Sequence, residues 1–265
     1  MAKAANRGRS RSPFDLTGKV AIVTGSGRGL GKGMAEALGA AGAKVVTGSR
    51  TLREAAATAG RIRQRGGEAT AFRVDITERP SVEALVASAL TTYRRIDVLV
   101  CNASTYIHKP ALEMGDADWQ RILATELVGY FNCAQAVAPA MFRQGGGSII
   151  MVSANSSEVG YRELTGVAAA KGAVDMLARN LAVEWGDRGI RVNTINPGYT
   201  EHVPSYGSDV NPGKGDIDAE VRRLTPLMRR GRIEELAHPV VFLASDAASF
   251  ITGVNLMVDG GYAIK

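Results

Sequence analysis

Short apolar runs alternate along the chain with longer segments in which apolar residues recur at helical spacing. The short runs predict strands at residues 19–24, 43–47, 69–74, 97–101, 148–152 and 191–195. Segments of helical spacing lie between them, at residues 30–41, 52–65, 81–93, 119–144 and 167–186. This alternation predicts βαβ units and a doubly wound α/β fold, a parallel sheet with helices on both faces. A last strand at residues 255–258 closes the predicted domain.

The chain divides into one domain at residues 13–265 and a basic tail at residues 1–12. The tail contains Lys3, Arg7, Arg9 and Arg11 and no acidic residue. It has no apolar period, so we expect it to be disordered and solvated. It supplies most of the net charge of +6, and the nearly neutral remainder gives no basis for a nucleic-acid partner. Residues 199–218 are rich in Gly, Pro, Asp and Ser, and we expect them to form a mobile substrate loop.

Composition is that of an ordinary globular protein. Hydrophobic residues make up 45% of the chain and charged residues 22%, and a chain of 265 residues can bury its core without a metal or disulfide. Cys101 and Cys133 lie in apolar surroundings without metal-ligand spacing, so we expect no metal site and a cytoplasmic location. The sequence contains neither the apolar run of a signal peptide nor that of a membrane span, so no membrane contact is expected.

A glycine-rich turn follows the first predicted strand and opens the first predicted helix. It reads TGSGRGLG over residues 24–31. In this context Gly25 permits a tight turn, Gly29 lets the backbone approach a pyrophosphate, and Gly31 allows close packing of helix on strand. The helix N-terminus offers free N–H groups to phosphate. We predict that the turn binds a dinucleotide through Gly25, Ser26, Arg28, Gly29, Leu30 and Gly31, the alternative being a purely structural turn.

The end of the second predicted strand favours NADP(H) over NAD(H). An NAD site usually has an acidic residue about 20 residues beyond the glycine turn, where it binds the ribose hydroxyls. Here the strand leads instead into Ser49 and Arg50, and Arg28 lies within the turn. Guanidinium groups and a hydroxyl suit a 2′-phosphate. The alternative is that both arginines are solvated surface residues.

These features make the sequence resemble the short-chain dehydrogenase/reductase family from Phe14 to the C-terminus. Residues 24–31 have that family's TGxxxGxG spacing, and residues 259–261 have its Asp-Gly-Gly ending. Residues 101–104, Cys-Asn-Ala-Ser, correspond to the family's Asn-Asn-Ala-Gly. The resemblance implies a Rossmann-type fold in which the adenine ring, the nicotinamide and its ribose are bound by Asp75, Ile76, Asn102, Ala103, Ser104, Lys171, Pro197, Gly198 and Thr200.

The resemblance also locates the family's catalytic positions, and three of the four carry other residues. Family enzymes use a tyrosine as proton donor, a lysine four residues later, a serine that holds the substrate oxygen, and an asparagine in a proton relay. In this sequence the lysine is Lys171, whereas the other positions fall on Val167, Ala154 and Glu126. Val and Ala cannot donate a proton. We expect Lys171 to bind the nicotinamide ribose, the alternative being an ordinary surface lysine.

Other groups in the predicted substrate region could replace the missing ones. Tyr161 is the first choice for a catalytic group, because its phenol is the same type of acid that the family uses. Glu126 could pair with Lys171, which would explain a buried acid at that position. The alternative for both Tyr161 and Glu126 is an ordinary loop or packing residue. Further candidates, each of which could equally be an ordinary loop or packing residue, are Glu163, Ser153, Ser156, Ser157, Tyr106, His108 and His202.

Three hypotheses about function follow. The first is an NADP(H)-dependent oxidoreductase acting on a small carbonyl or alcohol, with rerouted proton transfer. The second is an isomerase, dehydratase or cyclase in which Glu126 or Glu163 does the chemistry. The third is a catalytically silent subunit. For all three we expect a small-molecule ligand and a homodimer or homotetramer, because related folds pair through their helices and C-terminal segments.

Overall fold

A single parallel sheet organises the part of the chain that the computed structural model describes, residues 12–201 and 217–265. Its seven strands lie in the order β3-β2-β1-β4-β5-β6-β7. They are β1 (Val20–Thr24), β2 (Lys44–Ser49), β3 (Ala69–Arg73), β4 (Val98–Cys101), β5 (Gly147–Val152), β6 (Ile190–Pro197) and β7 (Asn255–Val258). The predicted doubly wound α/β fold is confirmed, and each predicted strand overlaps an observed one.

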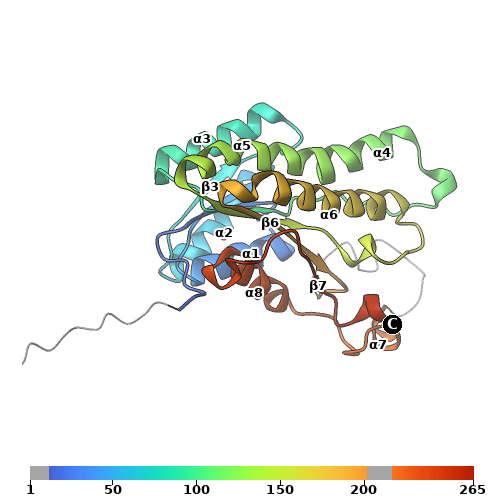
Figure 1. Ribbon diagram of the computed structural model, residues 1–265. Coiled ribbons are helices and arrows are strands. Elements are labelled where there is room, and N and C mark those ends of the chain that lie inside the picture. Colours follow the sequence, from blue (N-terminus) through green and yellow to red (C-terminus); the bar gives the residue numbers. More distant parts are fainter. Residues whose placement is uncertain (1–11, 202–216) are drawn as a thin grey trace, which may run out of the picture.

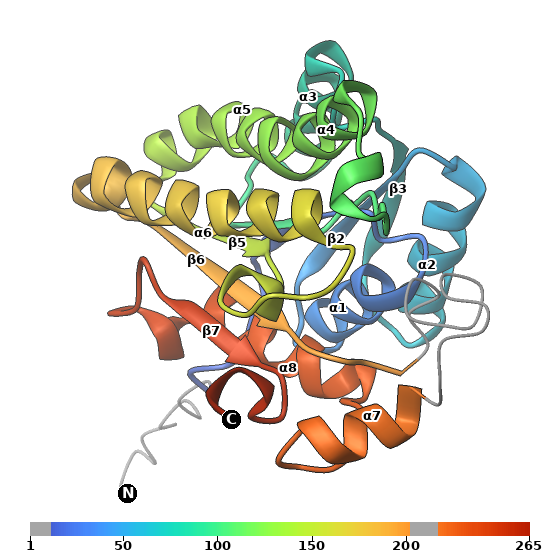
Figure 2. The same cartoon turned by 90° about the vertical axis from the view of Figure 1, so that its right-hand side faces the viewer.

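Helices cover both faces of this sheet (Figures 1 and 2). One face carries α1 (Gly29–Ala40), α2 (Leu52–Gln64) and α8 (Ile233–Ala244), and the other carries α3 (Arg79–Tyr93), α5 (Gly129–Gln144) and α6 (Thr165–Trp185). A separate hydrophobic core fills each interface. Because the central strands are buried on both faces, they read in the sequence as almost uninterrupted apolar runs.

The strand order reverses between β1 and β4, and this reversal places the candidate site. From β1 the chain proceeds outward to β2 and β3, then returns to pair β4 with the other side of β1. The Thr24 hydroxyl joins the ends of these two strands, because it donates to the Val100 carbonyl and accepts from the Asn102 amide. Open α/β sheets bind ligands at the carboxyl ends of the strands beside such a reversal.

The long helix predicted at residues 119–144 is divided into three segments. It begins as α4 (Asp116–Leu123), passes through a π-helical turn at Ala124–Val128 and continues as α5. A π-helical turn contains one more residue than an α-helical turn, so a search at helical spacing does not detect it. Such turns are frequent at functional sites, and this one carries the buried Glu126.

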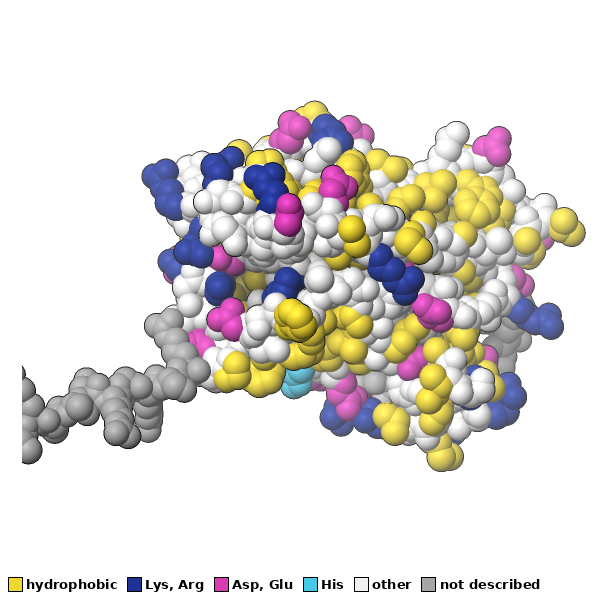
Figure 3. All heavy atoms as spheres, in the orientation of Figure 1, with side chains coloured by type: hydrophobic (Ala, Val, Ile, Leu, Met, Phe, Trp, Pro, Cys, Tyr) yellow, Lys and Arg dark blue, Asp and Glu magenta, His cyan; other side chains and the backbone are white. Residues whose placement is uncertain are grey.

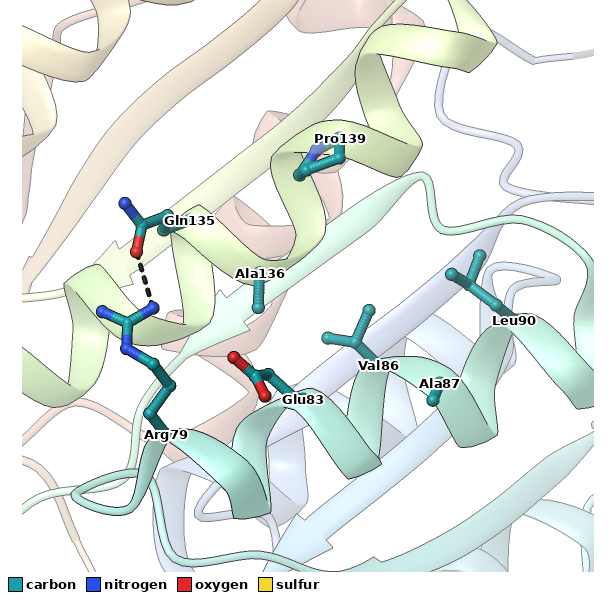
Figure 4. A pocket seen from close by; sticks show the side chains of 8 residues that line it. All are labelled: Arg79, Glu83, Val86, Ala87, Leu90, Gln135, Ala136 and Pro139. Carbon is teal, nitrogen blue, oxygen red and sulfur yellow. Dashed lines mark hydrogen bonds between the residues drawn. The ribbon is translucent and has the colours of Figure 1, made fainter.

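Pro139 lies inside α5 and borders a shallow groove against α3 (Figure 4). The groove has an apolar floor formed by Val86, Leu90 and Ala136, and at one end the Arg79 guanidinium donates to the Gln135 side chain at 2.6 Å. None of the residues predicted to bind a cofactor or substrate lines it.

Short helical segments complete the described structure. They are the 3-10 turns Ala111–Glu113, Asn155–Ser157, Gly186–Arg188, Asp246–Ala248 and Tyr262–Ile264, and the helix α7 (Ile217–Leu224). The helix α7 begins inside the predicted loop at residues 199–218. Residues 1–11 and 202–216 lie outside the described residues, so the prediction for the tail, most of that loop and His202 are not tested.

The described surface has a mixed charge distribution. On the face shown in Figure 3, Lys and Arg side chains lie among Asp and Glu side chains, without a continuous basic stripe. Among the described residues, no helix combines the length and the apolar character that crossing a membrane requires.

Candidate active site

The glycine-rich turn between β1 and α1 has the shape of a phosphate cradle. Gly25 adopts a φ of +66°, and a Cβ there would lie 2.6 Å from the Cα of Ala103. A Cβ on Gly31 would collide with the Gly25 carbonyl. Gly29, with a φ of +55°, faces open space, with no atom within 4 Å of its Cβ position. The turn is therefore packed tightly on one side and open on the other, which is the arrangement that a dinucleotide pyrophosphate requires.

The start of α1 supplies donors to this open side. Its N-cap residue, Arg28, has extended backbone geometry, and no side chain caps the helix. The first N–H groups of a helix have no partner within the helix, so uncapped ones are available to an anion. Ser26 and Asn102 support the turn instead. The Ser26 hydroxyl donates to the Gly48 carbonyl, and the Asn102 amide donates to the carbonyls of Thr24 and Gly25.

The side chains predicted to select the cofactor surround the end of β2. Arg28 and Arg50 are exposed, and Ser49 is partly buried beside Gly27. An acidic group that the sequence analysis overlooked also lies here. The Oε2 atom of Glu54 would be 2.9 Å from a Cβ on Gly27. Glu54 belongs to the first turn of α2 rather than to the strand end, which is why a search at the usual position missed it.

The predicted adenine pair lies in the turn after β3. The carboxylate of Asp75 accepts hydrogen bonds from the amide and hydroxyl of Thr77, at 3.0 and 2.8 Å. Ile76 is 3% exposed, and a Cβ on Gly129 would lie 2.8 Å from it. These contacts fix the loop that would form one wall of an adenine pocket.

The predicted nicotinamide turn follows β6. A Cβ on Gly198 would lie 2.7 Å from the Cβ of Asp259, so only glycine fits between this turn and the segment after β7. Thr200 is buried, and its hydroxyl donates to the Gly198 carbonyl at 3.1 Å. The turn at Pro197 is thereby held at the carboxyl edge of the sheet, on the same edge as the glycine cradle.

A buried ion pair between Lys171 and Glu126 lies at the centre of the candidate site. The Lys171 ammonium is 2.7 Å from Glu126 Oε2, and the two side chains are 6% and 0% exposed. The ammonium also donates to the Val152 carbonyl at 2.8 Å and lies 5.3 Å from the centre of the Tyr130 ring. The pairing expected from the sequence is confirmed, and the interpretation of Lys171 as an ordinary surface lysine is wrong.

The ion pair also connects the π-helical turn and α6 to the loop after β4. Glu126 Oε1 accepts from the Ser104 hydroxyl at 2.5 Å and from the Thr105 amide at 2.8 Å. The carboxylate therefore accepts three hydrogen bonds, two of them on the oxygen that faces this loop. A carboxylate bound in this way acts as a fixed counter-ion and anchor.

Apolar side chains fill the space one helical turn before Lys171. Val167 is 4% exposed and belongs to a cluster with Ile122, Leu164 and Ala170. Partly buried side chains pack against this cluster from the surrounding loops and from the end of α4: Tyr106, Ile107, Met114, Leu123 and Tyr161. We call these nine residues the Val167 cluster. Ala154, at the end of β5, presents its carbonyl to the Asn196 amide at 3.3 Å.

Tyr161 lies in an aromatic cluster with Tyr199 and Tyr262. Its ring stacks on Tyr262 with centroids 5.4 Å apart and meets Tyr199 edge-on at 6.2 Å. Its hydroxyl accepts from the Asn155 amide at 2.7 Å. Burial, followed by the neighbouring phenols of Tyr262 and Tyr199, raises the pKa of Tyr161 well above its usual value. The phenol therefore stays protonated and is a weak acid.

The remaining sequence candidates fall into two groups. His108 and Glu163 form a pair, with Nδ1 of His108 3.0 Å from Glu163 Oε2, and Tyr106 stacks on His108. The serines form hydrogen bonds within the fold or are buried in it. Ser153 donates to the Lys171 carbonyl, and Ser157 accepts from the Asn196 amide; Ser156 is buried.

One buried polar group that sequence reasoning missed lies behind the ion pair. Asp175, one turn after Lys171 on α6, accepts from the Asn196 amide of β6 at 2.9 Å. The signal available was a carboxylate spaced four residues after a lysine, in the largely apolar first half of the helix. Within residues 12–201 and 217–265, no group of three or more His, Cys, Asp or Glu side chains could hold a metal ion.

Comparison with known proteins agrees with this geometry. A family model described as enoyl-(acyl carrier protein) reductase matches residues 25–263. The chain is 36% identical over 253 residues to D-threitol dehydrogenase of Mycolicibacterium smegmatis, with 95% of each protein covered. It is 36% identical over 252 residues to 3β-hydroxysteroid dehydrogenase 1 of Eggerthella lenta, with 94% of this chain and 95% of that protein covered.

A solved structure shows the same fold. It is a gluconate 5-dehydrogenase from Burkholderia cenocepacia J2315 in complex with NADP and tartrate, 35% identical in sequence. It matches with a TM-score of 0.90, covering 96% of this chain and 98% of that one. The chain therefore belongs to the short-chain dehydrogenase/reductase family of oxidoreductases.

Proposed function

We propose that this protein is an NADP(H)-dependent oxidoreductase that interconverts a small carbonyl compound and the corresponding alcohol. The observation that carries the proposal is the alignment, on one edge of the sheet, of an open glycine cradle with the anchored ammonium of Lys171. Bound NADPH would supply a hydride to the carbonyl carbon. Gly25, Arg28, Gly29, Leu30 and Gly31 would hold its phosphates, with Ser26 and Asn102 supporting the turn.

Lys171 would bind the nicotinamide ribose. An ammonium group has three N–H donors. Two are used by Glu126 and Val152, and within the described residues the third makes no hydrogen bond. That donor can serve a ribose hydroxyl without breaking the ion pair, so Glu126 acts as a positioning residue for Lys171. Ala103, Ser104, Pro197, Gly198 and Thr200 would form the surrounding nicotinamide pocket.

The family's proton-transfer groups are replaced in this proposal. Val167 and Ala154 would stand at the tyrosine and serine positions, and Glu126 at the asparagine position. Tyr161 would line the substrate pocket and donate a hydrogen bond, because a phenol that holds its proton tightly donates a hydrogen bond more readily than it transfers a proton.

A non-redox enzyme in which Glu126 acts as acid or base fits the geometry less well, because three donors already occupy that carboxylate. A catalytically silent subunit would need the same cofactor site, so turnover is what separates it from the first proposal.

The expected activity is carbonyl-dependent oxidation of NADPH. Screening the protein against a panel of ketones and aldehydes should give one alcohol formed for each NADPH consumed, followed by absorbance at 340 nm and by product analysis. Turnover of a carbonyl compound without NADPH consumption would instead identify an isomerase-type enzyme. NADPH binding without any turnover would identify a silent subunit.

Cofactor preference should depend on opposing charges around Ser49. We propose that Arg28 and Arg50 attract a 2′-phosphate, which the carboxylate of Glu54 repels. A hydrogen bond to a charged group contributes about 1.5–3 kcal/mol, so Arg50→Asp should weaken NADPH binding by at least roughly 10–100-fold, and Glu54→Gln should strengthen it. Fluorescence titration with NADPH and NADH measures both effects. Arg143→Asp, at the end of α5, is the matched control. Identical NADPH and NADH curves for the unmutated protein would contradict the assignment.

Restoring the family's groups should restore its usual chemistry. In Val167→Tyr/Ala154→Ser, a phenol lies one turn before Lys171, whose charge lowers the pKa of that phenol. We expect this variant to gain NADPH-dependent reduction of simple ketones and to lose native activity. Packing a larger ring into the Val167 cluster should cost about 1–3 kcal/mol of stability. Val167→Phe/Ala154→Ser is the control without the hydroxyl. If both variants fold and bind NADPH and reduce ketones equally, the phenol is not the missing group.

We further propose a closed homo-oligomer, a dimer or tetramer, in the cytoplasm. Large apolar side chains are exposed on α6, where Met176 is 51% and Val183 is 86% exposed, and Phe250 is fully exposed near the C-terminal strand. Both cysteines are free and buried, which suits a reducing compartment.

A further inference from the structure

His108 and Glu163 form a paired acid–base group outside the machinery described above. Nδ1 of His108 is 3.0 Å from Glu163 Oε2, and the side chains are 15% and 23% exposed. Within the described residues, this is the one hydrogen-bond or ion-pair contact of the imidazole. A carboxylate bound to Nδ1 fixes a proton on that nitrogen and leaves Nε2 to exchange a proton with a substrate. Imidazoles are oriented in this way in acid–base catalysis.

The backbone around Glu163 holds this pair in place. Glu163 is one of three described non-glycine residues with positive φ, at +63°. Its carbonyl accepts from the Lys109 amide at 2.8 Å, while its side chain holds His108. Two adjacent contacts therefore join the loop after β4 to the loop after β5. Backbone strain of this kind costs on the order of 1–3 kcal/mol and persists where surrounding structure enforces it, often at active sites.

The pair lies beside the position from which the family's phenol is missing. His108 follows Tyr106 and Ile107, which both belong to the Val167 cluster. Its ring stacks on Tyr106 with centroids 6.3 Å apart. Glu163 precedes Val167 by four residues. The same loop after β4 is bonded to Glu126, and through it to Lys171, by Ser104 and Thr105. The imidazole therefore lies at the edge of the candidate active site that contains Lys171.

We propose that His108, oriented by Glu163, is the catalytic proton donor and acceptor for the substrate oxygen. The inference rests on the proposed oxidoreductase function. In reduction, the carbonyl carbon gains a hydride from NADPH, the π-electron pair of the C=O bond moves to oxygen, and that oxygen takes a proton from Nε2 of the imidazolium. The products are the alcohol, NADP⁺ and neutral imidazole, which regains its proton from water. Alcohol oxidation reverses each transfer.

The alternatives within the site are weaker. The phenol of Tyr161 is bound to Asn155 and has a raised pKa. Glu126 already accepts three hydrogen bonds, and Lys171 is held by Glu126 and Val152. Histidine is the side chain that most often acts as a general acid or base, and the contact with Glu163 occupies only Nδ1 of His108. His108 is therefore the group on this rim best suited to both directions of the reaction.

The test compares four variants on the full-length protein with NADPH and the ketone that the unmutated protein reduces fastest. His108→Ala should lower kcat by roughly 10²–10⁴-fold, the contribution of a positioned general acid, with KM and NADPH affinity nearly unchanged. Added imidazole should restore part of the rate. His108→Gln keeps a side chain that can donate a hydrogen bond to Glu163, and it should be as slow as His108→Ala. This variant keeps the test decisive if His108→Ala folds poorly. Tyr161→Phe removes the hydrogen bond that this phenol would donate to the substrate, so it should raise KM, while kcat falls far less than in His108→Ala. His238→Gln, an exposed histidine on α8, is the matched control and should be unchanged.

A second readout is independent of turnover. Long-range ¹H–¹⁵N spectra of the protein should show His108 with its proton on Nδ1, and Glu163→Ala, which removes the acceptor, should abolish that preference. Full activity in His108→Gln, or a loss of kcat in Tyr161→Phe as large as that expected for His108→Ala, would overturn the assignment while leaving the oxidoreductase proposal standing. Absence of NADPH oxidation by the unmutated protein with every carbonyl would overturn both.

Discussion

The buried contact between Lys171 and Glu126 is the constraint on which the candidate site depends. Two opposite charges with almost no exposure are stable only if each is well paired and hydrogen-bonded. The structure meets that requirement with the Val152 carbonyl, the Ser104 hydroxyl and the Thr105 amide. As a result, the end of β5, the π-helical turn, α6 and the loop after β4 are held in one arrangement. Removing either charge would leave the other buried without a partner.

This constraint offers a physical explanation for the catalytic replacements that we propose. An asparagine beside a lysine can hold a water or a carbonyl group, whereas a glutamate neutralises the lysine directly. With Glu126 as its counter-ion, Lys171 stays buried, and in our proposal its remaining donor would bind a ribose hydroxyl. The space beside it can then be apolar, as the Val167 cluster is. In the mechanism that we propose, proton transfer would come from His108 and Glu163 at the edge of the pocket.

The sequence predicted those features that depend on local pattern. Buried parallel strands are continuous apolar runs, and the glycine turn needs three glycines at a fixed spacing, so both were identified with bounds close to those observed. The pairing of Glu126 with Lys171 followed from aligning two helices to family positions. Contacts between loops leave no comparable signal. The two members of the pair His108–Glu163 are 55 positions apart in the chain. The π-helical turn has the same apolar pattern as the helices on either side of it. Glu54 contacts the glycine turn from α2, away from the position at which an acidic residue was sought.

The most direct test of this account is a double-mutant cycle on the ion pair, measured as free energies of unfolding in urea. Glu126→Leu and Lys171→Met should each destabilise the protein by about 3–5 kcal/mol, because each leaves one buried charge without a partner. The double variant should lose far less than the sum of the two, because it leaves no unpaired charge. Additive losses would show that the two side chains do not depend on each other, and would contradict the role of Glu126 as the anchor of Lys171.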